Sequence, residues 1–252
     1  MRRPLVIGNW KMNGSLSANA TLLSNINAYL ANEDRVDVGV CPSFVYLPQV
    51  AEFSKSSSLK VGAQTLSEAA QGAFTGEISA SMLKEFDVSF VLVGHSERRV
   101  LFGETDEIVA KKVQAALAAG LTPVLCVGET LDERNTGATE SVIERQVRSV
   151  LDLVGVAEFA KLVIAYEPVW AIGTGETATP EQAQEVHALI RGLIAQLNST
   201  IAESLIILYG GSVNAGNAKE LMKQPDVDGG LVGGASLKSG DFVSICKAAI
   251  IK

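Results

Sequence analysis

Phe90-Val91-Leu92-Val93-Gly94-His95-Ser96-Glu97-Arg98-Arg99 is the stretch of sequence that indicates the fold. Its first four residues are continuously apolar, which is typical of a parallel strand buried on both faces. Gly94 ends the apolar run, and the residues from Ser96 onward resemble a first helical turn. The stretch therefore predicts a buried strand that passes almost directly into a helix, with His95 at the junction.

This unit of a buried strand followed by a helix recurs along the whole chain. Helical periodicity separates the apolar runs, as in the stripes within 108–117 and 142–151 and in the capped start Thr179-Pro180-Glu181-Gln182. The average spacing is about 31 residues, close to one unit of a (β/α)8 domain. The apolar runs begin near Leu5, Val38, Leu59, Phe90, Val124, Leu162, Leu205 and Gly230.

Eight strands that alternate with helices leave two architectures of the α/β class. One is an open doubly wound sheet, and the other is a closed (β/α)8 barrel, with eight parallel strands surrounded by helices. The length of 252 residues favours the closed barrel. No Pro/Gly/Ser-rich linker or run of charge divides the chain, so we expect residues 1–252 to form a single domain.

Composition excludes several classes of protein. With 47% hydrophobic and 19% charged residues, the chain can build a sizeable core and is not disordered. A net charge of -7 argues against binding to nucleic acid or to a membrane surface, and no apolar run is long enough to span a bilayer. The first apolar run stops at Asn9, too early for a secretory signal. Cys41, Cys126 and Cys246 lie in apolar runs, which is typical of reduced cysteines, so we expect a cytoplasmic location.

The carboxyl ends of the predicted strands carry the polar residues. Because either architecture places its chemistry at these ends, and a barrel brings all of them to one mouth, we expect a single polar site there. In chain order the strand ends carry Asn9 and Lys11, then His95, Ser96 and Glu97, then Glu129, then Glu167, and finally the glycine clusters at 210–212 and 233–236.

Glu167 and His95 are the candidate chemical groups. A buried carboxylate at a strand end can serve as the base that removes a proton from a carbon next to a carbonyl, although it can also be a structural cap. His95 can be a structural histidine, but its place before a helix start disfavours imidazolium and favours a neutral hydrogen-bond donor. Lys11 and Asn9 are candidate partners in stabilising an enolate oxygen. His187 lies mid-helix beside Glu185, and we expect it to be a solvated helix residue.

The late glycine clusters indicate phosphate binding. Glycine lets backbone N–H groups approach an anion, and loops after the seventh and eighth strands of barrels commonly do so. The segment 168–178 is apolar, contains glycines near one end and lies between a strand and a capped helix. Such a loop is typical of a lid, although it can also be a packed connection.

Taken together, these segments resemble the triosephosphate isomerase family over the whole chain. The segment around Glu167 is highly specific by itself. The matching segments are Gly8-Asn9-Trp10-Lys11-Met12-Asn13, Gly62-Ala63-Gln64, Gly94-His95-Ser96-Glu97-Arg98-Arg99, Cys126-Val127-Gly128-Glu129, Ala165-Tyr166-Glu167-Pro168-Val169-Trp170-Ala171-Ile172-Gly173-Thr174-Gly175, Tyr209-Gly210-Gly211-Ser212-Val213 and Leu231-Val232-Gly233-Gly234-Ala235.

The resemblance implies a TIM barrel that interconverts dihydroxyacetone phosphate and D-glyceraldehyde 3-phosphate, with no metal and no organic cofactor. Glu167 would move the proton, while neutral His95, Asn9 and Lys11 would polarise the substrate oxygens. Glu97 would orient Lys11, and Ser96 would hold Glu167 when the lid is open. The remaining implied roles are the phosphate contacts from backbone groups of Gly173, Ser212, Gly233 and Gly234, and closure of the lid over residues 168–178 to exclude water.

The resemblance also implies a homodimer. The segment 64–78 has neither helical nor strand period and carries Phe74, so it looks like the family's interdigitating loop, with Thr75 reaching the partner's site. One departure from the family pattern is Glu176, where relatives often carry lysine at the far hinge of the lid. We expect it to alter lid kinetics at most.

Other functions remain open on the sequence. Lys11 could form a Schiff base in another phosphate-binding barrel enzyme, such as an aldolase. Metal-assisted chemistry is disfavoured because the chain has two histidines and no Cys/His spacing pattern. A barrel used only for binding would leave the site, the phosphate loops and the lid without a purpose.

Overall fold

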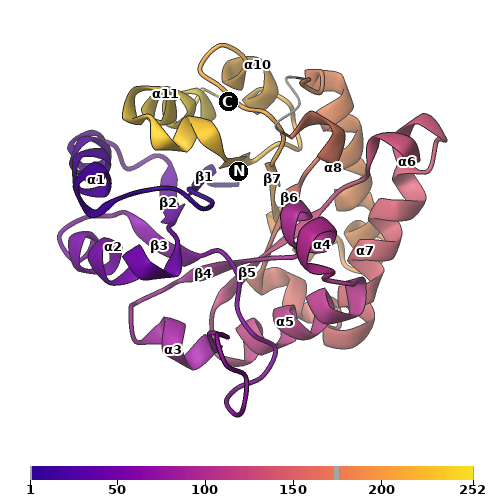
Figure 1. Ribbon diagram of the computed structural model, residues 1–252. Helices are drawn as coiled ribbons and strands as arrows, with labels where there is room; N and C mark the ends of the chain where they lie inside the picture. Colours follow the sequence, from indigo (N-terminus) through magenta and orange to yellow (C-terminus); the bar gives the residue numbers. More distant parts are fainter. Residues whose placement is uncertain (1, 173–175, 252) are drawn as a thin grey trace.

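The computed structural model describes residues 2–172 and 176–251, and its centre is a ring of parallel strands surrounded by helices (Figure 1). The ring closes because β1 pairs with both β2 and β8. The closed (β/α)8 barrel expected from the sequence is therefore confirmed, whereas the single-domain organisation stays a prediction. The strands are β1 (Leu5–Asn9), β2 (Asp37–Cys41), β3 (Lys60–Ala63), β4 (Phe90–Val93), β5 (Thr122–Val127), β6 (Val163–Tyr166), β7 (Ile206–Tyr209) and β8 (Gly229–Val232).

The helices surround the barrel, and α8 begins at the capping signal that the sequence shows. Thr179 and Gln182 form the expected reciprocal capping box at the start of α8, with Pro180 in the first helical position. No helix in the described ranges is long and apolar enough to cross a membrane. The helices are α1 (Leu16–Leu30), α2 (Leu47–Ser54), α3 (Ala80–Lys84), α4 (Ser96–Phe102), α5 (Asp106–Ala118), α6 (Leu131–Asn135), α7 (Thr139–Val154), α8 (Pro180–Ala195), α9 (Ser199–Ser204), α10 (Ala218–Met222), α11 (Ser239–Ala249) and the 3₁₀ segments η1 (Phe44–Tyr46), η2 (Val156–Lys161), η3 (Val169–Ala171) and η4 (Gly234–Leu237).

The core has two layers, one between the strands and the helices and one inside the barrel. Phe90 fills much of the inner layer next to β2 and β3. A Cβ atom at Gly39 would lie 2.5 Å from the Phe90 ring, and one at Gly62 would lie 2.2 Å from it. Both distances are too short for real atoms, so the aromatic ring occupies space that the two glycines leave empty.

His187 is fully buried, which corrects the expectation of a solvated helix residue. It lies on the same face of α8 as the buried Val186, Ile190 and Ile194, so the helix turns the imidazole toward the barrel. Its Nδ1 lies 3.2 Å from the carbonyl oxygen of Asp226. Burial lowers the pKa of His187 to about 4, because the charged imidazolium would lose its water.

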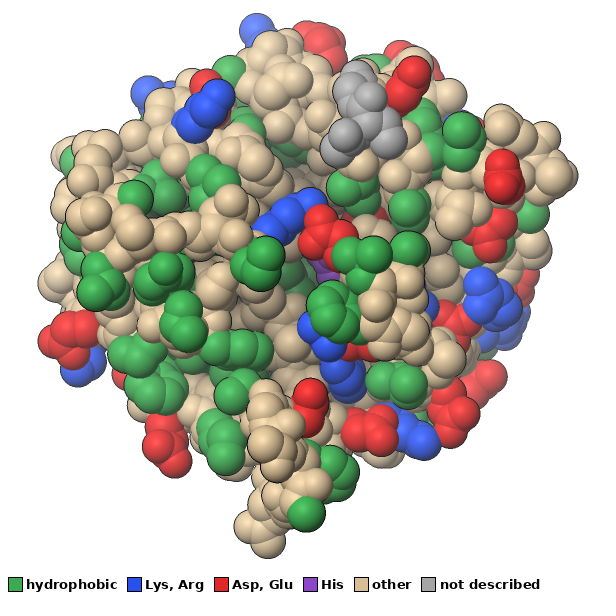
Figure 2. All heavy atoms as spheres, in the orientation of Figure 1, with side chains coloured by type: hydrophobic (Ala, Val, Ile, Leu, Met, Phe, Trp, Pro, Cys, Tyr) green, Lys and Arg blue, Asp and Glu red, His purple; other side chains and the backbone are tan. Residues whose placement is uncertain are grey.

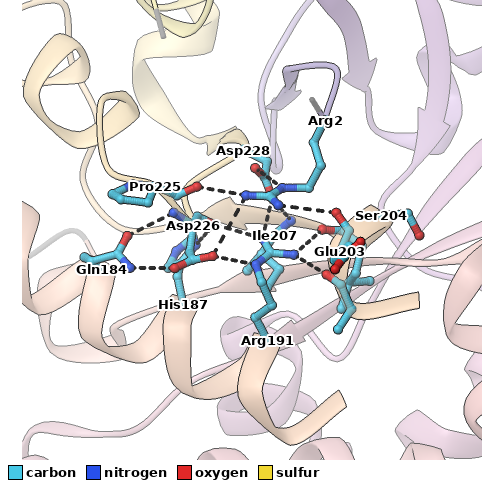
Figure 3. A network of polar contacts seen from close by, with 12 residues as sticks. Arg2, Gln184, His187, Arg191, Glu203, Ser204, Ile207, Pro225, Asp226 and Asp228 are labelled. Atoms are coloured by element: carbon cyan, nitrogen blue, oxygen red, sulfur yellow. Dashed lines mark hydrogen bonds and ion pairs between the residues drawn. The ribbon is translucent and has the colours of Figure 1, made fainter. Parts of the chain in front are cut away.

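A polar network ties this part of α8 to the amino-terminal ends of β7 and β8 (Figure 3). The Arg191 guanidinium donates to Asp226 at 2.6 Å and to Asp228 at 2.8 Å. Asp228 also accepts hydrogen bonds from the side chain of Arg2 and from the backbone N–H of Ile207. The network lies at the end of the barrel opposite the strand carboxyl ends, where polar contacts contribute to stability.

We expect stability to fall as the pH drops from about 6.5 to about 4, the interval between the usual and the native pKa of His187. In this interval the unfolded chain binds a proton that native His187 rejects, so stability is complete above pH 6.5 and is lost toward pH 4. The full effect is about 3 kcal/mol. Thermal unfolding of the wild type and of His187→Gln across this range measures it. An equally steep loss in both proteins would contradict the assignment.

Candidate active site

The carboxyl ends of β1, β4, β6, β7 and β8 surround a cavity of about 390 Å³. Figure 2 shows a central hollow with a histidine at its base, flanked by basic and acidic side chains. The predicted residues Ser96 and Glu97 do not line the cavity but bond to residues that do, and Gly173 lies outside the described residues. The predicted residues that line it are Asn9, Lys11, His95, Glu167, Ser212, Gly233 and Gly234.

Glu167 directly follows β6 and is only 1% exposed. The backbone N–H of Ser96, at the start of α4, donates to Glu167 Oε2 at 2.8 Å. Glu167 Oε1 has no hydrogen-bond partner among the described residues, although it lies 3.1 Å from His95 Nε2. The carboxylate is therefore held through one oxygen by a helix start, while its second oxygen stays available in a dry environment.

Gly210, at the end of β7, provides the space that Glu167 occupies. A Cβ atom at this position would lie 2.8 Å from Glu167 Cγ and 3.1 Å from the carbonyl oxygen of Tyr166. Any side chain here would press on the carboxylate or on the end of β6. The glycine cluster after β7, which the sequence analysis assigns to anion binding, thus also leaves room for the carboxylate.

His95 is the N-cap of α4, and its Nδ1 accepts the backbone N–H of Glu97 at 3.2 Å. A nitrogen that accepts a hydrogen bond carries no hydrogen, so in the neutral ring the hydrogen lies on Nε2. Nε2 is the nitrogen near Glu167. The helix start thus fixes the tautomer that can donate a hydrogen bond at the cavity.

Lys11 follows β1 and contributes its ammonium group to the cavity. Its Nζ lies 2.5 Å from Glu97 Oε1, in the arrangement that the family resemblance implies. The Asn9 side chain accepts the backbone N–H of Lys11 at 3.0 Å. A Cβ atom at Gly233 would approach Lys11 Cε to 3.3 Å, so the absence of a side chain there leaves room for the lysine.

The sequence analysis did not predict two features of the candidate site. The first is Lys238, which lines the cavity together with Gly233 and Gly234 and adds a second cation near the predicted anion site. It stands four residues after the second glycine of the predicted phosphate-binding cluster, and this proximity is the signal that the sequence offers for it.

The second missed feature is the fully buried Glu129, which anchors the beginning of the predicted lid segment. Its Oε1 accepts hydrogen bonds from Tyr166 Oη, Trp170 Nε1 and Arg134 Nη1, each at 3.0 Å. Burial raises the pKa of Tyr166, and the negative charge of Glu129 raises it further, so the phenol stays a donor. Trp170 belongs to the predicted lid, and this carboxylate therefore holds the beginning of that segment to the end of β5.

Comparisons with known proteins agree with this geometry. The family model described as triosephosphate isomerase matches residues 4–249. A triosephosphate isomerase of Thiobacillus denitrificans is 58% identical over 249 residues, which cover 99% of each chain. Those of Dechloromonas aromatica and Nitrosococcus oceani are 57% and 56% identical over 249 residues, which cover 99% of this chain and 100% of each relative. The chain therefore belongs to the triosephosphate isomerase family.

Proposed function

We propose that the cavity at the barrel mouth is where this isomerase interconverts dihydroxyacetone phosphate and D-glyceraldehyde 3-phosphate, with Glu167 as the base. The observation that carries the proposal is the buried Glu167 carboxylate, whose unpartnered Oε1 lies 3.1 Å from His95 Nε2. A proton acceptor and a hydrogen-bond donor thus meet at one point of the cavity, as removal of a proton next to a carbonyl requires.

The proposed reaction begins when Glu167 leaves the Ser96 N–H and takes a proton from C1 of dihydroxyacetone phosphate. The electron pair of the C–H bond forms the C1–C2 double bond, and the carbonyl oxygen at C2 becomes an enediolate oxygen. His95 Nε2–H and the Lys11 ammonium stabilise that charge, and Asn9 supports them. After a proton moves between the two oxygens through His95, Glu167 returns its proton to C2 and gives the aldehyde.

Backbone N–H groups of Ser212, Gly233 and Gly234 are proposed to hold the phosphate, with Gly173 as a further donor. Support comes from the position of these residues on one side of the cavity and from the two cations, Lys11 and Lys238, that line it. Closure of residues 168–178 would exclude water and protect the enediolate from loss of phosphate.

The alternative Schiff-base chemistry would require Lys11 to attack a carbonyl as a neutral amine. Lys11 Nζ is instead engaged in an ion pair with Glu97, at 2.5 Å, and an ammonium in such a pair has no lone pair for the attack. Borohydride trapping in the presence of dihydroxyacetone phosphate tests this alternative, because only a Schiff base would label Lys11.

The proposed function is tested by incubating the enzyme with dihydroxyacetone phosphate in tritiated water. Tritium incorporation at carbon, together with aldehyde formation in a coupled assay, would report the proton abstraction itself. Full activity in EDTA is expected because no step uses a metal. Turnover at the uncatalysed rate would contradict the proposal.

We also propose a homodimer built on the loops beside the cavity, in a cytoplasmic location. The loop between β3 and α3 projects at the lower edge of Figure 1, and Phe74 of this loop is 53% exposed. Met12, Val45 and Leu101, from the segments that follow β1, β2 and β4, are each more than two-thirds exposed. Apolar side chains so exposed favour burial against a second copy, with Thr75 near the partner's cavity.

Sedimentation equilibrium tests the dimer. The wild type is expected to sediment as a dimer, and Leu101→Glu is expected to shift the population toward monomer because it would bury a charge in the interface. Leu197→Glu is the matched control, because Leu197 is likewise an exposed leucine, at 53%, but lies after α8, away from these segments. A monomeric wild type would contradict the proposal.

A further inference from the structure

The backbone of Lys11 is strained. Its φ is +50°, and among the described non-glycine residues only Lys11 and Asp87 have a positive φ. Aspartate tolerates this left-handed conformation because its short side chain can bond locally, whereas lysine has no such compensation. Strain of this kind persists only where the surroundings hold it, and it is concentrated at functional sites.

Two side chains from neighbouring loops hold the carbonyl group of Lys11. Ser43 Oγ, after β2, donates to the Lys11 carbonyl oxygen at 2.9 Å. Gln64 Nε2, after β3, donates to the same oxygen at 2.8 Å and to the carbonyl oxygen of Cys41 at 3.0 Å. The Gln64 amide therefore bridges the strained residue and the end of β2.

The other backbone groups of this turn are also bonded. The N–H of Lys11 donates to Asn9 Oδ1 at 3.0 Å, and that of Trp10 donates to the carbonyl oxygen of Cys41 at 3.1 Å. The Trp10 carbonyl oxygen accepts from Asn13 Nδ2 at 2.8 Å. With both peptide groups fixed, the Cα–Cβ bond of Lys11 has one direction, which leads the side chain past Gly233 to Glu97.

We propose that Gln64, assisted by Ser43, is a positioning residue for the isomerisation. Its amide holds Lys11 in the left-handed conformation that directs the ammonium group into the cavity. A relaxed backbone at residue 11 would turn the Cα–Cβ bond and withdraw Nζ from the substrate. The proposal rests on the role of Lys11 in the proposed function.

The variant Gln64→Met keeps the length of the side chain and removes both hydrogen bonds. Its kcat/KM is expected to fall about 10-fold, the factor that corresponds to about 1.4 kcal/mol, and most of the change should be in KM because Lys11 already binds the substrate in the ground state. Gln49→Met is the matched control. Gln49 Nε2 also donates to a backbone carbonyl, that of Leu16 at 2.7 Å, but Leu16 has no positive φ. Its kcat/KM should change less than about 2-fold.

A double-mutant cycle with Lys11→Gly separates positioning from general support of the fold. Glycine adopts a positive φ freely and has no ammonium group to direct, so Gln64→Met should leave kcat/KM nearly unchanged in the Lys11→Gly background. An equal loss in both backgrounds, or no loss in the wild-type background, would overturn the proposal. If Lys11→Gly alone kept full activity, the role assigned to Lys11 would be wrong, which is a different failure.

Ser43→Ala provides a second variant should Gln64→Met not fold. It removes one donor to the Lys11 carbonyl and keeps the amide of Gln64, so kcat/KM should fall about 3-fold, again only when Lys11 is present. A loss that is independent of Lys11 would contradict the inference in this variant too.

Discussion

Glu167→Asp is expected to lower kcat by about 10²-fold, because a displacement of about 1 Å at a reacting group has an effect of this size. Aspartate keeps the carboxylate but withdraws it by one methylene from the position that Glu167 occupies between Ser96 and His95. Because burial and charge are unchanged, the variant tests the position of the carboxylate rather than its presence. Steady-state kinetics in both directions of the reaction provide the measurement, and KM should change little.

The matched control is Glu85→Asp, which makes the same change at an exposed position after α3. It should retain normal kinetics, and both variants should unfold at nearly the wild-type temperature. Near-normal turnover of Glu167→Asp would remove Glu167 from the role of base and, with it, the proposed mechanism.

The substitution His95→Asn is expected to lower kcat by about 10²–10³-fold, the usual effect of losing one donor to a developing oxyanion. Asparagine is a good N-cap, so its oxygen can still accept the Glu97 N–H that His95 Nδ1 accepts at 3.2 Å. The shorter side chain cannot place a donor where Nε2 lies. The helix start is thus preserved while the donor at the cavity is lost.

Nitrogen NMR of the wild type provides an independent check, because it distinguishes the two neutral tautomers. The Nδ1 contact with Glu97 predicts that the hydrogen lies on Nε2. A spectrum with the hydrogen on Nδ1, or a kcat within 10-fold of the wild type in His95→Asn, would contradict the assigned role.

The strands were predictable because continuous apolar runs such as Phe90–Val93 have a direct physical cause, burial on both faces. The residues that line the cavity were predictable because a barrel brings the carboxyl ends of its strands to one mouth. The place of Glu167 and His95 at this mouth follows from the strand ends alone, without the positions of the side chains. His187 was judged as a lone polar residue, although Ala183, Val186 and Ile190 lie on the same helical face. The spacing of these apolar residues therefore predicts that His187 is buried.

The Glu129 anchor could not be predicted in the same way. Tyr166, Trp170 and Arg134 come from three separate segments, and each alone is an ordinary residue of a strand end, a loop or a short helix. Their meeting at one carboxylate oxygen depends on how the loops after β5 and β6 fold back on the barrel. Such contacts between distant segments are seen only in the three-dimensional structure. The hydrogen bonds from Ser43 and Gln64 to Lys11 are contacts of the same kind.

The close fit of Phe90 against Gly39 and Gly62 links three positions on three strands. A larger residue at either glycine would demand a smaller one at position 90, and a smaller residue there would leave a void unless a glycine gained a side chain. These positions should therefore covary among homologues, with the total volume conserved rather than each identity. A designer who wishes to reshape this end of the barrel would have to exchange all three together.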